Sequence, residues 1–177
     1  MELNGLVGPI EGFSPQVSTL VTMLAFTRAQ VVRCVERMST PDLDFLIDER
    51  ANSIGATLLH LAATETYYQL NTFGELKWDS WSDEIKQKWD LPMNLGEPAR
   101  QTIKGYSVDF YLTTLHETRE KTIAEFRKRD DQWLAVVDVE WKWTNHAKWF
   151  HVAEHESNHN GQFKFLRSRF PGAISRS

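Results

Sequence analysis

Residues 144–170 read TNHAKWFHVAEHESNHNGQFKFLRSRF, and this stretch decides the fold that the sequence predicts. It opens on a good N-cap, Thr144, and meets no proline before Pro171-Gly172, so it predicts one long helix that ends near Phe170. Inside it, His155 and His159 stand at i and i+4, which places both imidazoles on one helix face about 6 Å apart. Two such rings can reach one divalent ion, and metal sites of this kind lie in the cores of helical bundles.

The segment from His155 to His159 also matches the H-E-x-x-H pattern of zinc proteases, but the rest of that pattern is missing. No His, Asp, Glu or Cys follows His159, and the extended motif needs Gly and His where the chain has Gln162 and Phe165. Glu156 points about 100° away from His155 around the helix, so it is a poor general base on metal-bound water. We expect Glu156 to be solvated or ion-paired, and any further metal ligand to lie upstream.

Three earlier stretches also carry apolar residues at helical spacing. They are residues 14–38, which open on Ser14-Pro15, residues 52–74, which are apolar nearly all round, and residues 107–126, which open on Ser107. The fold class is therefore all-α, a four-helix bundle. One domain of residues 1–177 is expected, with its ordered core at roughly residues 14–170.

Two connections interrupt the helices. Residues 77–105 predict a loop with one short helix, Ser82 to Trp89, because Pro92, Gly96 and Pro98 break any longer element. Residues 137–143 alternate between apolar and charged side chains, which predicts a strand or an extended connection before the fourth helix.

Composition narrows the functional classes. The chain of 177 residues has a formal charge of −4 and a pI near 5.9, so no basic stripe is available for nucleic acid or an anionic membrane. Its one cysteine, Cys34, is expected to be a packed core thiol and suits a reducing compartment. Residues 1–13 lack the features of a signal peptide, and no apolar run approaches about 18 residues, so a cytoplasmic location is expected.

The remaining histidines differ in their promise as ligands. His60 lies in the most apolar helix, where a buried ring needs a partner, either a metal or a hydrogen bond within the core. His151 and His159 are about 12 Å apart along their helix, so they cannot both bind one ion. His116 has polar neighbours and is expected at the surface, and His146 falls in the first helical turn, where a capping or loop-side role is expected.

Two segments resemble the DinB/YfiT-like family of four-helix metalloproteins. One runs from Asn52-Ser53 to His60 and resembles the family's second-helix metal histidine. The other runs from His151 to Gln162 and is similar to a histidine pair that ends in His-x-Gly-Gln. The resemblance spans most of residues 14–170. It implies that His60, His155 and His159 hold a divalent ion, nickel or zinc, with water in the open positions and with His151 beside the site. The family often has a further His or Arg near the last motif, where this chain has Asn158 and Asn160.

The sequence also predicts structural roles for Gly161 and Gln162, which follow the histidine pair. Gly161 sits inside a helix at a cost of about 1 kcal/mol relative to alanine, so it is expected to permit the close approach of another helix. Gln162, three residues after His159, is either a support that orients the ligand ring or a surface side chain.

Three neutral imidazoles leave a metal its full charge and an exchangeable position, which permits two reactions. A low-molecular-weight thiol can be held as thiolate and attack an electrophile, or a bound water can hydrolyse an ester or amide. Family members that use thiols are bacterial S-transferases and isomerases, so the resemblance favours thiol transfer over hydrolysis or a non-catalytic, stress-related metal-binding role. The two connections carry several tryptophans, for which three roles are expected as alternatives: a lid over the metal end, completion of the core, or burial in the surface of a homodimer. These tryptophans are Trp78, Trp81, Trp89, Trp141 and Trp143.

Overall fold

The structure, a computed structural model, describes residues 7–171, and long helices make up its body. These are α1 (Pro15–Val35), α3 (Ile54–Thr72), α6 (Val108–Phe126) and α8 (Asn145–Arg167). Shorter helices lie in the connections: α2 (Thr40–Leu43), α4 (Asp83–Asn94), α5 (Gly96–Thr102) and α7 (Asp131–Ala135). Within residues 7–171 there is no strand, so the predicted all-α class is confirmed.

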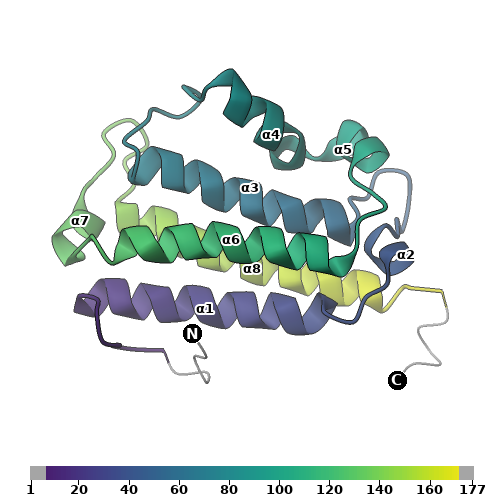
Figure 1. Ribbon diagram of the computed structural model, residues 1–177, viewed down its shortest axis with the longest axis horizontal. Coiled ribbons are helices and arrows are strands. Elements are labelled where there is room, and N and C mark those ends of the chain that lie inside the picture. The colour runs from purple at the N-terminus through teal and green to yellow at the C-terminus, as the bar shows by residue number, and fades with distance from the viewer. Residues whose placement is uncertain (1–6, 172–177) are drawn as a thin grey trace.

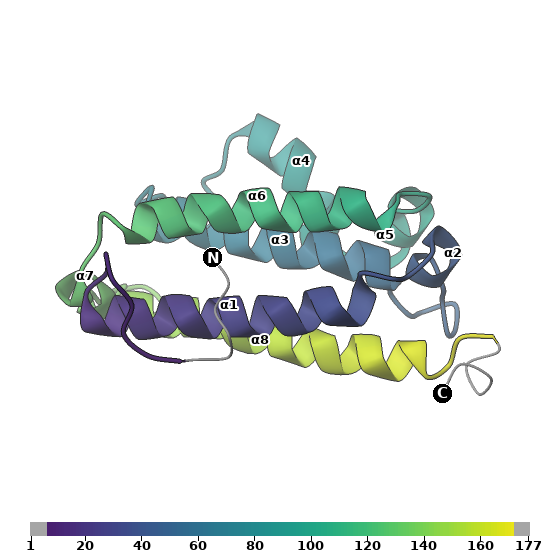
Figure 2. The ribbon, with the colours of Figure 1, turned by 60° about the horizontal axis from the view of Figure 1, so that its bottom comes forward.

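The four long helices pack in two layers (Figures 1 and 2). Helix α1 lies along α8 in one layer, and α3 lies along α6 in the other. The layers meet where α3 packs against α8, and α4 covers the outer side of α3. The histidine-bearing segments of α3 and α8 are therefore brought side by side, although nearly a hundred residues separate them in the sequence.

The predicted helix starts are largely confirmed by their capping hydrogen bonds. Ser53 Oγ accepts from the Ala56 amide of α3 at 3.1 Å, and Thr144 Oγ1 accepts from the Ala147 amide of α8 at 3.0 Å. Ser14 makes no such bond at the start of α1. The carboxylate of Asp131 in α7 takes its place and accepts from the backbone amides of Gln16 and Val17. A residue more than a hundred positions away thus caps the first helix.

Helix α4 corrects the prediction of a short helix that ends at Trp89. It begins after its cap Ser82, as expected, but continues through Pro92 to Asn94. Trp89 and Pro92 are both buried where α4 packs on α3, and this burial outweighs the backbone hydrogen bond that proline removes. Gly96, with φ of 77°, then permits the turn into α5.

Residues 137–143 do not form a strand. Val137 and Thr144 make an isolated bridge that closes a turn, and the Asp138 side chain accepts from the amides of Glu140 and Trp141 within it. The buried Lys148 also donates to Asp138 at 2.6 Å. Local hydrogen bonding to Asp138 therefore overrides the two-residue alternation, and the segment is a connection.

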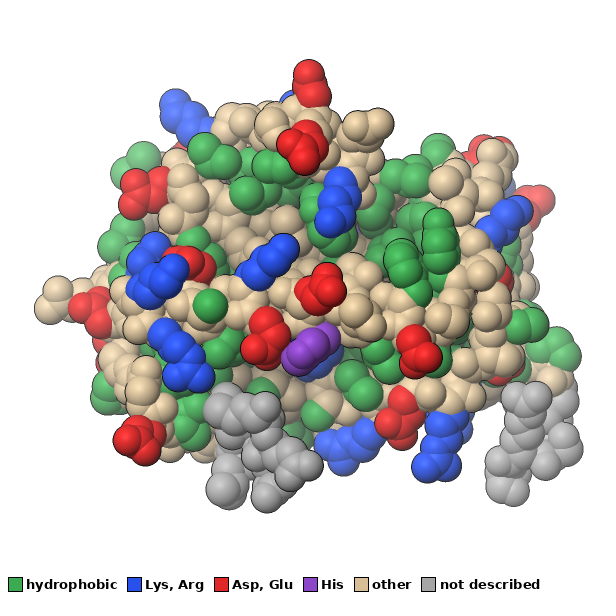
Figure 3. Space-filling view, in the orientation of Figure 1, with side chains coloured by type: hydrophobic (Ala, Val, Ile, Leu, Met, Phe, Trp, Pro, Cys, Tyr) green, Lys and Arg blue, Asp and Glu red, His purple; other side chains and the backbone are tan. Residues whose placement is uncertain are grey.

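The last helix ends three residues before the predicted Phe170, which is itself buried against Phe45. Of the expected Pro171-Gly172 stop, Gly172 lies outside the described residues. In the part of the chain that is described, no helix is long and apolar enough to cross a membrane. The face drawn in Figure 3 carries interspersed acidic and basic side chains and no continuous basic stripe.

Candidate metal centre

Three histidines from two helices converge between α3 and α8. One ring nitrogen from each of His60, His155 and His159 lies within 4.8 Å of the other two. The Nε2 atom of His155 is 3.2 Å from that of His60 and 3.0 Å from that of His159. Two nitrogens bonded to one ion at about 2.1 Å lie about 3.0 to 3.4 Å apart, so these separations fit ligands of a single metal.

The outer nitrogens of two rings fix which nitrogen carries the proton. His60 Nδ1 is 3.1 Å from the Pro92 carbonyl oxygen, an atom that only accepts, so Nδ1 is the protonated nitrogen. His159 Nδ1 lies 2.9 Å from Gln162 Oε1, which also only accepts, so this Nδ1 carries the proton as well. The Nε2 atoms of both neutral rings are therefore lone-pair acceptors, and both face His155 Nε2. Because His155 can donate at most one proton between them, the cluster has an unmet demand for a cation.

The protonation state of the cluster suits a cation as well. Burial lowers the pKa of His60, and the nearby His159 lowers it further. Burial, with the three neighbouring histidines, lowers the pKa of His155 to about 3. Burial also lowers the pKa of His159, although the hydrogen bond to Gln162 opposes this. All three rings are thus neutral at pH 7, and protons do not compete for their lone pairs.

The segment after the histidine pair holds one confirmed expectation and one error. Gln162 is exposed, and its amide oxygen orients the His159 ring as the first alternative proposed. Gly161 does not permit a close helix approach, because a Cβ atom there would meet no atom within 4 Å. Gly55 in α3 has that role instead, since its Cβ position lies 2.5 Å from Tyr111 Oη.

His151 lies beside the cluster and outside it, as the resemblance implied. Its ring centre is 5.5 Å from that of His155, and Tyr68 Oη lies 2.9 Å from its Nδ1. Burial raises the pKa of Tyr68 to about 12, so the hydroxyl stays protonated and donates to Nδ1. An imidazole that accepts at Nδ1 carries its proton on Nε2.

The tryptophans fall into a buried group and an exposed group. Trp81 and Trp89 are buried in the core, and Trp81 stacks on Tyr67. Trp141 and Trp143 are 45% and 39% exposed, and Trp143 lies edge-on to His151 at 5.9 Å. The connection before α8 therefore borders one flank of the histidine cluster.

Glu156 faces away from the metal ligands, as predicted, and of the two expected alternatives, solvated or ion-paired, it is ion-paired and buried. It is 1% exposed, and its carboxylate accepts from Arg28 of α1 and Arg119 of α6 at 2.5 and 2.7 Å. The same two arginines bind Glu65 of α3. Each long helix thus contributes one charged residue to a buried network.

The other two histidines take no part in the cluster. His116 is exposed on α6, as predicted, and His146 is half-buried in the first turn of α8. The sequence interpretation missed the Pro92 carbonyl, the Tyr68 hydroxyl and the arginine partners. Only the arginine network had a signal, because Glu65 in a nearly apolar helix requires a buried partner.

Comparisons with known proteins identify the family of the chain and a solved structure of similar fold. A family model described as Mycothiol-S-transferase matches residues 19–172. Among solved structures, the chain is similar to a conserved protein from Enterococcus faecalis, with 13% identity, a TM-score of 0.61 and coverage of 84% of this chain and 93% of that one. At this identity the likeness concerns the fold alone. No curated protein matches the chain.

Proposed function

Since the chain belongs to the mycothiol-S-transferase family, we propose that it is a metal-dependent thiol S-transferase whose ion, nickel or zinc, is held by His60, His155 and His159. This family is DinB-like, so the resemblance found in the sequence is confirmed. The observation that supports the metal most directly is the pair of Nε2 lone pairs that converge on His155. Within residues 7–171 no group donates to both of these nitrogens, and a cation would satisfy both.

The proposed reaction joins a thiol sulfur to an electrophilic carbon. The thiol loses its proton to solvent, the sulfur forms the new S–C bond, and the leaving group departs with the electron pair of the bond that breaks. A divalent ion held by His60, His155 and His159 would supply the positive charge that favours the thiolate near neutral pH.

The protein itself supplies metal ligands whose orientation is fixed, in a partly buried site. The Pro92 carbonyl and Gln162 amide hold two of the rings in one tautomer, so little reorientation is needed on binding. The hydroxyl of Tyr68 fixes the His151 ring, whose Nε2 lies 4.0 Å from Glu154 Oε2 and whose centre lies 5.9 Å from that of the exposed Trp143.

Metal analysis of purified protein and of matched histidine variants tests the ligand set. We expect close to one nickel or zinc ion per chain in the unaltered protein and a loss of at least tenfold in metal affinity in His60→Gln and His155→Gln. His116→Gln is the matched control, because His116 is exposed on α6 and should leave the metal content unchanged. Full metal content in His60→Gln would contradict the proposed site.

A second experiment tests the reaction. The metal-loaded and metal-free proteins are supplied with mycothiol and 1-chloro-2,4-dinitrobenzene, and in parallel with 4-nitrophenyl acetate and no thiol. We expect thiol-dependent release of chloride by the loaded protein only. Ester hydrolysis without thiol would favour the hydrolase alternative, and unfolding on metal removal without turnover would favour a structural metal.

The cytoplasmic location and the homodimer stay predictions. Exposed apolar residues gather in the connection before α8, at Val136, Val137, Val139, Trp141 and Trp143. Sedimentation of the metal-loaded protein would report whether it forms a dimer, and Val139→Lys would report whether this surface takes part.

A further inference from the structure

The Pro92 carbonyl can hold the His60 ring because of the way in which α4 ends. In a continuous helix this oxygen would accept from the amide four residues further on, which belongs to Gly96. Helix α4 ends before Leu95, whose φ of 54° turns the chain away from the helix axis. The Gly96 amide donates instead to Asn52 Oδ1 at 3.2 Å. The Pro92 oxygen accepts from His60 Nδ1 at 3.1 Å.

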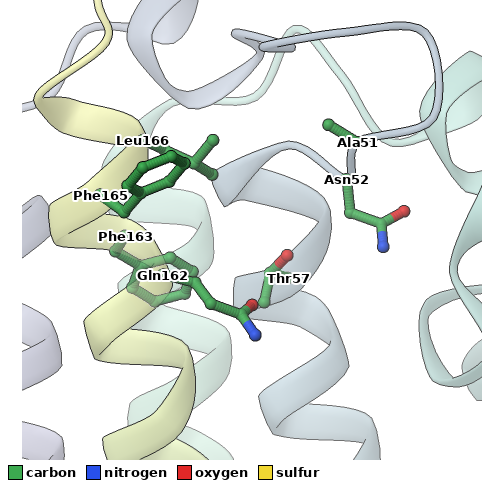
Figure 4. A pocket seen from close by; sticks show the side chains of 7 residues that line it. All are labelled: Ala51, Asn52, Thr57, Gln162, Phe163, Phe165 and Leu166. Atoms are coloured by element: carbon green, nitrogen blue, oxygen red, sulfur yellow. The ribbon is translucent and has the colours of Figure 1, made fainter.

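Asn52 lies directly before the helix that carries His60. Its neighbour Ser53 is the N-cap of α3, so the position of Asn52 is fixed where that helix begins. Figure 4 shows the Asn52 side chain on one wall of a pocket of about 190 Å³, and Gln162 lines the same pocket from α8. Gln162 orients the ring of His159. The residues that support two different metal ligands therefore border one pocket.

The body of α4 is attached to α3 by contacts that do not involve Asn52. Tyr67 Oη donates to the Asp90 carboxylate, and Trp89 and Pro92 are buried where the two helices pack. Loss of the Asn52 side chain should therefore release the end of α4 and leave the helix docked on α3.

The end of a helix is a suitable partner for an imidazole that binds a cation. The last carbonyls of a helix lack partners within it and carry the negative end of its dipole. A ring whose Nδ1–H donates to such an oxygen has its lone pair on Nε2 and is a stronger ligand for a metal ion. In His60 this Nε2 lies 3.2 Å from that of His155, inside the proposed metal site.

We propose that Asn52 is a positioning residue of the metal site, because its hold on the Gly96 amide keeps the Pro92 carbonyl directed at His60. Without that hold, the Gly96 amide is free to pair with the Pro92 oxygen and to draw it along the helix axis. His60 Nδ1 then loses its acceptor, and the ring populates the Nε2–H tautomer, which cannot bind the ion. This inference rests on the proposed function and adds to it a residue that acts through two hydrogen bonds and a turn.

Three variants of Asn52 test the proposal. Asn52→Leu removes the acceptor at nearly equal volume, Asn52→Ala removes it without adding bulk, should leucine prevent folding, and Asn52→Asp keeps it. We expect the affinity for nickel or zinc to fall at least tenfold in the leucine and alanine variants and to stay within about threefold in the aspartate variant. In metal-free protein labelled with nitrogen-15 histidine, His60 should show the Nδ1–H tautomer in the unaltered and aspartate proteins. The other two variants should show a mixture with the Nε2–H tautomer.

Arg100→Met is the matched control. Arg100 also ties α5 to the segment before α3, since it donates to the Arg50 carbonyl oxygen at 3.2 Å, but it leaves the Gly96 amide in place. The metal affinity and the His60 tautomer should both stay unchanged in this variant. Equal losses in Asn52→Leu and Arg100→Met would overturn the proposal, because they would show a general loosening of the connection. An unchanged His60 tautomer in Asn52→Leu and Asn52→Ala would overturn it as well.

The tautomer measurement separates this inference from the proposed function, since it needs neither metal nor thiol. A shift of the tautomer in the leucine and alanine variants alone, in a protein that binds no nickel or zinc, would support the role of Asn52 and contradict the metal-dependent function. Equal metal affinity and an equal tautomer in all variants would leave the proposed function standing and remove the role of Asn52.

Discussion

At the scale of single residues, the site depends on which nitrogen of each imidazole ring carries the proton. The Pro92 carbonyl and the Gln162 amide take the outer nitrogens of His60 and His159, so the inner nitrogens point lone pairs at one place. Protonation of three imidazoles in a half-buried cluster would place positive charges next to one another. The free energy of unfolding of the metal-free protein should therefore fall when these rings are protonated.

The pKa values of all three rings lie below that of a free imidazole, at about 6.5. As the pH falls below that value, the unfolded chain binds protons that the folded chain does not, so the free energy of unfolding decreases. We expect urea unfolding of the metal-free protein to show this decrease between pH 7.5 and 5.5. This window lies above the ordinary titration of carboxylates.

His155→Gln should flatten that dependence, because burial and the neighbouring histidines lower the pKa of His155 to about 3. His116→Gln serves as the control, since its ring is exposed. A metal-free protein that is as stable at pH 5.5 as at pH 7.5 would contradict the assignment of three neutral rings.

At the scale of helices, close packing is set by glycine at a position that the sequence did not single out. Gly161 inside α8 faces open space, whereas Gly55 at the start of α3 lies against the fully buried Tyr111 of α6. The α3–α6 contact thus depends on a missing side chain, and the histidine-bearing turn of α8 does not.

Alanine at these two positions should have opposite effects. Gly161→Ala adds helix propensity without a clash and should raise the free energy of unfolding by about 0.5 to 1 kcal/mol. Gly55→Ala forces Tyr111 to move within a packed core and should lower it by about 1 to 3 kcal/mol. Thermal and urea unfolding of the two variants would measure the difference, and equal effects would contradict the packing of α3 on α6.

At the scale of the whole molecule, the buried charge network joins both layers of the bundle. Burial alone would raise the pKa of Glu65, but Arg119 and Arg28 hold it below its usual range. Burial acts to lower the pKa of Arg119, and Glu65 and Glu156 raise it instead. The two guanidinium groups also donate to the backbone carbonyls of Leu115 and Leu24, so the charges are paired and their hydrogen bonds are largely satisfied.

Glu156 should therefore contribute to stability and not to metal binding, although it is the glutamate of an H-E-x-x-H segment. Glu156→Gln leaves an uncompensated cation in the network and should lower the free energy of unfolding by about 3 kcal/mol, with metal content unchanged. Glu154→Gln, on the exposed part of the same helix, should change it by less than about 0.5 kcal/mol. Loss of the metal in a folded Glu156→Gln protein would contradict this division of roles.

The sequence by itself determined the features that depend on neighbours along the chain. Apolar residues at helical spacing predicted the four long helices, and the i and i+4 spacing placed His155 and His159 on one face. Buried surroundings in α3 pointed to His60 as the third member of the cluster. Each of these signals is local, because helix period and capping are set within a few residues.

Only the tertiary structure decided the contacts between segments that are distant in the sequence. Pro92 lies in a helix because that helix packs on α3, and its carbonyl meets His60 for the same reason. The partners of Glu156, the cap that Asp131 places on α1, and the hydrogen bond from Gly96 to Asn52 likewise arise from how helices lie against one another. Local propensity gives no information on such pairings, since the free energy that selects them comes from burial and hydrogen bonding between whole elements.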